Sequence, residues 1–213
     1  MENETVQQIR TKNRRTLLIA LALFVIPVIV AAVLLKTGLY KSVGTSNKGL
    51  LINPPLSFED IPLKDAANKV LDPEQFKRKW WLVYVIPEHC DESCSNSLFQ
   101  MRQVHTALGP EQSRVERLVI STAPLEAPYD RLIKEEFPKL RVVFTQASQL
   151  KQAFAPVEDN QLKATPSGHI YLVDTMGAVF MYYPTYQDEQ ESILKGRGLL
   201  KDLKKVLKLS KIG

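Results

Sequence analysis

The sequence predicts an α/β fold, with a central mixed sheet and covering helices, behind an N-terminal transmembrane helix. Residues 16–35 contain no charged side chain. Further along, segments with the apolar content of buried strands alternate with segments of helical periodicity, and a late pair of strands follows without a helix between them. The alternation indicates parallel strands, and the late pair adds antiparallel ones.

The uncharged run near the N-terminus has the length of a membrane span. Its 20 residues would form a helix of about 30 Å, the thickness of a bilayer's hydrocarbon core, and Pro27 is tolerated inside such a span. A cleaved signal peptide has a shorter apolar core. We therefore expect an uncleaved, single-pass transmembrane helix over residues 16–38.

The charges that flank this span set its expected orientation. Residues 1–15 carry four Lys and Arg residues and residues 36–50 carry three. This weak positive-inside bias favours a cytoplasmic tail over residues 1–15. The C-terminal domain would then lie in the periplasm, with the span in the inner membrane of a bacterium.

The charge balance of the remaining chain excludes a nucleic-acid-binding class. Residues 1–40 hold five of the 28 basic side chains and two of the 23 acidic ones, so the rest is nearly neutral. Residues 195–211 nevertheless carry seven Lys and Arg residues, five of them on one expected helix. These form either a solvated helix face or a contact with anionic lipid or an acidic partner.

The expected order of elements after the span is a linker and one folded domain. Residues 39–54 read as the linker, because 41–49 are small and polar and Pro54 and Pro55 exclude a helix. The domain covers residues 55–213. Its expected strands are 80–86, 114–122, 140–146 and two within 168–183, and its expected helices are 97–109, 129–137, 148–155 and 198–211.

The only two cysteines, Cys90 and Cys94, lie where the first long strand gives way to the first long helix. Free N–H groups and the positive dipole end of a helix start favour thiolate over thiol. The spacing suits a disulfide or two sulfur ligands to one metal ion. A structural disulfide or two buried inert thiols are the alternatives, but a bridge closing so short a loop stabilises weakly.

The strand, the cysteine-bearing loop, the helix and the late Thr165-Pro166 before a hairpin look like the thioredoxin fold. The spacing is C-x-x-x-C, and the segment KWWLVYVIPEHCDESC resembles the Sco/SenC family of cytochrome c oxidase assembly proteins. Lys79, Trp80, His89 and the two cysteines match that family. The resemblance covers roughly residues 55–210, and only the cysteine segment is specific.

The resemblance implies copper binding by Cys90, Cys94 and a distal histidine, a set that suits Cu(I) and Cu(II). His169 is the histidine nearest the expected third position, three residues from it. That position, five before Tyr171, is occupied by proline. Asp91 also departs from the proline that the family has after its first cysteine.

The other two histidines are weaker ligand candidates. His105 follows Cys94 by 11 residues, which is about 16 Å along a helix and too far to share a metal. His89 adjoins Cys90, and neighbours at a strand end usually point in different directions.

Thr165-Pro166 supports a second reading, because thioredoxin-like oxidoreductases hold a cis-proline preceded by threonine against their cysteines. No motif supports a peroxidase of the same fold. The expected function is maturation of a respiratory oxidase, by delivering copper to its copper subunit or by keeping that subunit's cysteines reduced. A metallochaperone or assembly factor fits better than a turnover enzyme. A metal-free thiol-disulfide oxidoreductase and a non-catalytic assembly scaffold remain the alternatives.

Overall fold

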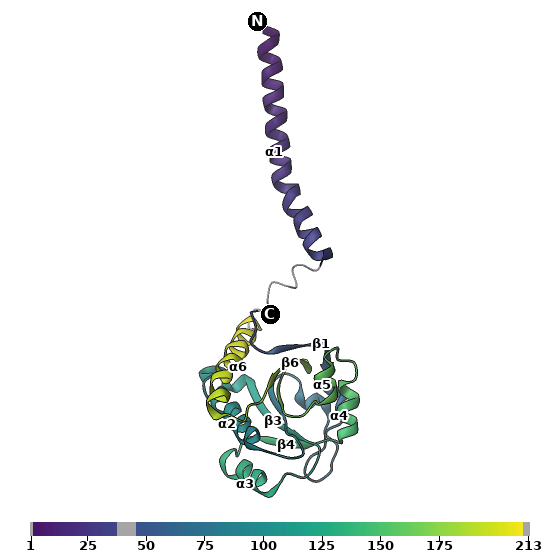
Figure 1. Cartoon of the computed structure of the whole chain (residues 1–213), viewed down its shortest axis with the longest axis vertical. Coiled ribbons are helices and arrows are strands. Elements are labelled where there is room, and N and C mark those ends of the chain that lie inside the picture. The colour runs from purple at the N-terminus through teal and green to yellow at the C-terminus, as the bar shows by residue number, and fades with distance from the viewer. Residues whose placement is uncertain (1, 38–45, 211–213) are drawn as a thin grey trace. The chain divides into compact units, whose positions relative to one another are not determined.

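The computed structural model describes residues 2–37 and 46–210, with side chains in the first segment from residue 13 onwards. It divides into two compact units, Met1–Ser46 and Asn47–Gly213. The first unit is the helix α1 (Glu2–Thr37), which continues through Pro27 (Figure 1). Within it, Asn13–Thr37 is long and apolar enough to cross a membrane and leaves its side chains exposed. The expected apolar span is therefore confirmed as a helix. Residue 38 of that span and residues 39–45 of the expected linker lie outside the described residues.

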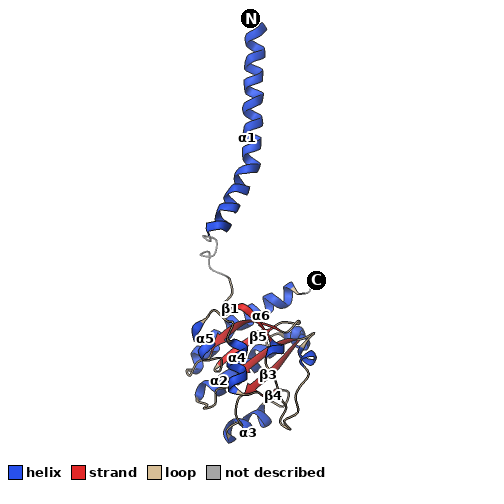
Figure 2. Ribbon diagram, turned by 90° about the vertical axis from the view of Figure 1, so that its right-hand side faces the viewer, coloured by secondary structure: helices blue, strands red, loops and turns tan. Residues whose placement is uncertain are grey.

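The second unit contains a six-stranded mixed sheet with the order β1-β6-β5-β2-β3-β4 (Figure 2). Strands β2, β3 and β4 pair in parallel fashion, whereas β5, β6 and β1 pair in antiparallel fashion. The strands are β1 (Leu50–Ser57), β2 (Trp80–Val85), β3 (Val115–Ser121), β4 (Arg141–Phe144), β5 (His169–Val173) and β6 (Ala178–Pro184). This confirms the expected α/β class with a mixed sheet.

Helices cover both faces of the sheet and give it two apolar cores. One core lies under α2 (Glu92–Thr106), α3 (Ala127–Glu136) and α6 (Glu189–Leu209), and the other under α4 (Ala147–Phe154) and α5 (Asn160–Ala164). Strand β2 is buried on both sides. Successive side chains along it alternate between the cores, so that Tyr84 faces α2 and Val85 faces α4.

Two helices begin earlier than their apolar periodicity predicts. Helix α2 starts at Glu92 and α6 at Glu189, because Asp91 and Asp188 cap their first turns through side-chain oxygens that accept backbone N–H groups. Both first turns are polar, so they carry no apolar stripe by which they could be recognised.

Residues 50–54 of strand β1 were expected to belong to the linker. The strand pairs with β6 through Leu50–Tyr182 and Leu51–Met181, and resumes at Leu56 after an irregularity that takes in the two prolines. Proline is tolerated there because β1 is an edge strand. The folded unit therefore includes residues 47–54. The short helix α5, which Asp159 caps, was not predicted either.

Candidate functional site

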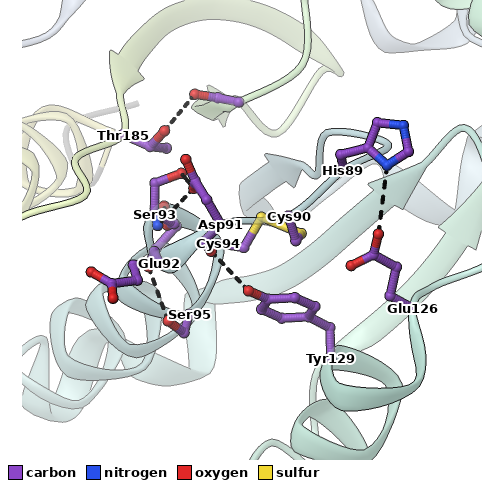
Figure 3. Close-up of a disulfide and its surroundings, with 12 residues drawn as sticks. His89, Cys90, Asp91, Glu92, Ser93, Cys94, Ser95, Glu126, Tyr129 and Thr185 are labelled. Carbon is purple, nitrogen blue, oxygen red and sulfur yellow. Dashed lines mark hydrogen bonds and ion pairs between the residues drawn. A yellow bond between two sulfur atoms is a disulfide. The ribbon is translucent and has the colours of Figure 1, made fainter.

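Cys90 and Cys94 form a disulfide at the N-terminus of α2, with their Cα atoms 5.6 Å apart (Figure 3). Cys90 ends the loop that leaves β2, and Cys94 lies in the first turn of the helix. The strand-loop-helix order of the sequence thus brings the two sulfurs together at the edge of the domain core.

The two cysteines differ in exposure. Cys94 is 0% exposed and belongs to the core beneath α2. Cys90 packs against the same core but is partly exposed. A thiol from another molecule can therefore reach the disulfide only from the side of Cys90.

Asp91 organises the loop between the cysteines. One carboxylate oxygen accepts hydrogen bonds from the Ser93 N–H at 2.9 Å and from the Ser93 hydroxyl at 2.5 Å. The other accepts from Nε2 of Gln187 at 2.6 Å. These hydrogen bonds, led by those from Ser93 and Gln187, lower the pKa of Asp91. Nδ2 of Asn96 also donates to the Gln187 carbonyl at 2.7 Å, so the helix start is tied to the segment after β6.

A second wall of the site comes from the start of α3. The Tyr129 hydroxyl donates to the Asp91 carbonyl at 2.8 Å, and Nδ1 of His89 lies 3.6 Å from a carboxylate oxygen of Glu126. The His89 side chain is 90% exposed and points away from the disulfide in Figure 3. The carboxylates of Asp91, Glu92 and Glu126 counteract the stabilisation that the helix N-terminus offers a thiolate.

Tyr84 lies in the core beneath this helix start. It is 0% exposed, and its hydroxyl has no hydrogen-bond partner among the described residues. Burial raises the pKa of Tyr84, and the nearby Ser97 hydroxyl offsets part of that rise. Ser97 instead donates to the Ser93 carbonyl at 2.6 Å.

His169 does not lie with the cysteines. It begins β5 opposite Val85, and its ring packs 5.3 Å from the ring of Tyr182 and 6.2 Å from that of Tyr171. Both tyrosines belong to the core beneath α4 and α5, so the ring of His169 that packs against them lies on the opposite side of the sheet from Cys94. The side-chain alternation of the strand is the physical reason.

The copper ligand set expected from the family resemblance is therefore not assembled. The two sulfurs are bonded to each other, and His169 is on the other face of the sheet. Among the described residues, no group of three or more His, Cys, Asp or Glu side chains is arranged to hold a metal ion. In this arrangement the residues do not fit copper.

The remaining residues singled out from the sequence also lie elsewhere. Nε2 of His105 lies 2.9 Å from the Val115 carbonyl, between α2 and β3. The cis-proline expected from Thr165-Pro166 is not present, since the cis peptide bond found within residues 2–37 and 46–210 is Asn53-Pro54. The carbonyl of Pro166 instead accepts from the Tyr171 hydroxyl at 2.5 Å.

Sequence reasoning missed the residues that hold the disulfide loop: Asn96, Glu126, Tyr129 and Gln187. They are up to 96 positions from the residues they contact and form no motif with them. Only the Asp91 cap carries a local signal, an aspartate that directly precedes a helix.

A family model described as "Transmembrane-like, thioredoxin-like, C-terminal domain" matches residues 80–210, more than half of the 213-residue chain. The chain belongs to this family. The match takes in β2, the disulfide and α6 of its transmembrane-like, thioredoxin-like C-terminal domain. No curated protein matches the sequence.

Several solved structures are similar to this thioredoxin-like domain, and one with a TM-score above 0.5 shares its fold. The apo Sco1 protein from Thermus thermophilus is 17% identical with a TM-score of 0.52, and the match covers 76% of this chain and 99% of that one. A thiol:disulfide interchange protein from Bacteroides sp. is 19% identical with a TM-score of 0.47, over 68% and 84% of the two chains. Copper-bound ScoI from Arabidopsis thaliana is 17% identical with a TM-score of 0.47, over 71% and 97%.

The arrangement in this thioredoxin-like domain suits thiol-disulfide exchange. A partly exposed sulfur can accept attack, and the bond that breaks releases a second sulfur held at a helix N-terminus, where N–H groups favour its thiolate form.

Proposed function

We propose that this protein is a membrane-anchored thiol-disulfide exchange factor that acts on cysteines of a respiratory oxidase during its assembly. The observation that carries the proposal is the Cys90–Cys94 disulfide, which has one partly exposed and one buried sulfur at the start of α2. A bridge used only for stability would gain little from so short a loop.

The exchange begins with the reduced pair. The Cys90 thiolate attacks a disulfide of the partner, forming a mixed disulfide and releasing one partner thiolate. The Cys94 thiolate then attacks the Cys90 sulfur, which forms the Cys90–Cys94 bond and releases the second partner thiolate. Two electrons pass to the partner, and its two thiolates take protons from water. A dithiol protein of the same compartment must reduce the pair again.

The choice of partner rests on sequence and fold together. The segment from Lys79 to Cys94 resembles that of Sco/SenC assembly proteins, and the domain shares its fold with the Sco1 protein from Thermus thermophilus. We therefore take the copper subunit of the oxidase as the partner.

The apolar helix α1 anchors the factor in this proposal. Asn13–Thr37 provides the span, and the basic residues before it favour a cytoplasmic N-terminus. The thioredoxin-like domain then works in the periplasm of a bacterium, a compartment in which disulfides form and are exchanged.

The experiment uses the full chain in uncharged detergent, reduced and freed of reductant. A two-cysteine disulfide peptide is added, and free peptide thiols are counted over time. The parent should convert one peptide per chain, while Cys90→Ser and Cys94→Ser should not complete the cycle. If the parent leaves the peptide oxidised, the proposal is contradicted, and the non-catalytic assembly scaffold is favoured instead.

Copper delivery is the second candidate, with copper as cargo and not as a resident cofactor. Reduction of the disulfide supplies two soft sulfur ligands, the pairing that the family resemblance implies.

The reduced chain is titrated with Cu(I), beside Cys90→Ser and His169→Ala. Because His169 lies on the other face of the sheet, His169→Ala should match the parent. Loss of binding in that variant would restore His169 as a ligand, and a parent that binds no copper removes this candidate.

A further inference from the structure

A cavity of about 380 Å³ lies between α6, the end of β6 and the segment that enters β1. Four basic residues line it: Lys48, Lys195, Arg197 and Lys201. Tyr183 and Tyr186 also line it, and no acidic residue does. Three of the basic residues of α6 therefore line a concave site.

The charge of this cavity is only weakly compensated. A Glu191 carboxylate lies 4.0 Å from Lys195, whose ammonium group also lies 5.6 Å from the centre of the Tyr186 ring. For Lys48, Arg197 and Lys201 no ion pair is found within the part of the chain that the structure describes. Four cations, set against the distant carboxylate of Glu191 and the buried carboxylate of Asp202 on the Lys48 backbone, create a field that attracts an anion.

The nearest buried carboxylate, Asp202, has its own donors. Its Oδ2 accepts from the backbone N–H groups of Lys48 at 2.6 Å and Gly49 at 2.8 Å, and from the Tyr183 hydroxyl at 2.9 Å. Asp202 is 2% exposed and is not one of the residues that line the cavity. Its role is to fix the chain beside α6, and so to fix the backbone that carries Lys48.

Close packing makes this wall rigid. A Cβ atom on Gly49 would lie 2.5 Å from Cζ of Tyr183, and one on Gly198 would lie 2.9 Å from Cβ of Lys48. Both approaches are possible only for glycine. The cavity is therefore formed before any ligand arrives, which lowers the entropic cost of binding.

We propose that this cavity binds the phosphate group of an anionic phospholipid. Arg and Lys donors suit phosphate, and each cation near a membrane surface strengthens binding to anionic lipid. The source of the phosphate follows from the sequence, since Lys48 comes 11 residues after Thr37, the end of the apolar helix. This choice of source rests on the proposed membrane anchor. A free phosphate-bearing solute has the same chemistry and is distinguished by the test.

The test titrates the full chain, in uncharged detergent, with short-chain phosphatidylglycerol, short-chain phosphatidylcholine and inorganic phosphate. Thermophoresis gives the dissociation constants. Phosphatidylglycerol should bind more tightly than the other two. Arg197→Gln/Lys201→Gln should weaken its binding roughly 30-fold, about fivefold for each charge removed. Lys204→Gln/Lys208→Gln removes equal charge from exposed positions of the same helix outside the cavity, and should change binding less than threefold.

Two results would overturn the proposal. Equal weakening in the two double variants would mean attraction to net charge and not to the cavity. Inorganic phosphate that binds as tightly as phosphatidylglycerol would remove the lipid assignment. Thermal melting of each variant excludes unfolding as the cause. The titration requires neither a bilayer nor thiol chemistry. A negative result would therefore count against lipid binding by the cavity, and not against the membrane anchor or the exchange function.

Discussion

Cys90 and Cys94 are joined by one disulfide, yet Cys90 is partly exposed and Cys94 is 0% exposed. This difference orders the exchange reaction, since only the Cys90 sulfur can meet a partner at the surface. It also separates their roles, because a buried sulfur at a helix start is suited to resolve a mixed disulfide that has already formed.

The Asp91 cap should stabilise the domain measurably. Asp91→Ala removes an N-cap and the acceptor for Gln187, and should cost about 1 kcal/mol of unfolding free energy. Asp91→Asn should retain most of it, because asparagine caps equally well. Fluorescence of Trp80 and Trp81, both in β2, reports unfolding of this domain.

The pH dependence of this effect has a defined sign. The folded pKa of Asp91 is lowered from 3.8, so its contribution is present above that value and lost as pH falls through the folded pKa. The difference between the parent and Asp91→Ala should therefore shrink in acid. Equal unfolding midpoints at pH 7 would contradict the capping role.

Two buried tyrosines on opposite faces of the sheet should respond differently to loss of their hydroxyls. Tyr84→Phe removes a hydroxyl without a partner, so stability should stay equal or rise by about 1 kcal/mol. Tyr171→Phe breaks the bond to Pro166 and should cost about 1 kcal/mol. Denaturant unfolding of the two variants measures both changes in stability. A larger loss of stability in Tyr84→Phe than in Tyr171→Phe would mean that the Tyr84 hydroxyl has a hydrogen-bond partner in solution.

The two half-buried histidines, His105 and His169, should make the domain less stable in mild acid. Burial is the largest cause that lowers the pKa of both His105 and His169 from 6.5. Below 6.5 the unfolded chain takes up protons that the folded chain does not, so stability falls until pH reaches the folded pKa. In the double variant His105→Gln/His169→Gln, the melting temperature should change less between about pH 7 and pH 5 than it does in the parent. His89→Gln is the control, and an unchanged slope in the double variant would refute the account.

The orientation in the membrane can be tested by reporter fusions after Gly49. A cytoplasmic N-terminus requires that a reporter active only in the periplasm be active at this junction and that one active only in the cytoplasm be silent. The opposite pattern would invert the topology and place the cysteines in a reducing compartment.

Much of the fold could be predicted from local patterns. The apolar run of β2 and the stripe of Leu98, Met101 and Val104 on α2 are consequences of burial. Burial requires apolar residues at regular spacings, and these spacings can be recognised in the sequence. Strand β1 could not be found, because an edge strand with two prolines has no such trace. The first turns of α2 and α6 were missed for a related reason, since they are polar and held by caps.

The site was predictable only in part. A cysteine pair at a strand-to-helix junction carries its own signal, and the structure joins the pair by a disulfide. The face on which His169 lies depends on the pairing register of β5 with β2, which no local pattern contains. Tyr129 and Gln187 reach Asp91 across the fold, so their part in the site follows from tertiary structure alone.

The central claim is that Cys90 is the attacking cysteine and Cys94 the resolving one. The most direct measurement is to incubate reduced Cys94→Ser and reduced Cys90→Ser with the same two-cysteine disulfide peptide and to record intact masses without reductant. The account predicts a lasting mixed disulfide on Cys90 in Cys94→Ser and little or none in Cys90→Ser. Equal adducts in both variants, or an adduct only in Cys90→Ser, would contradict it.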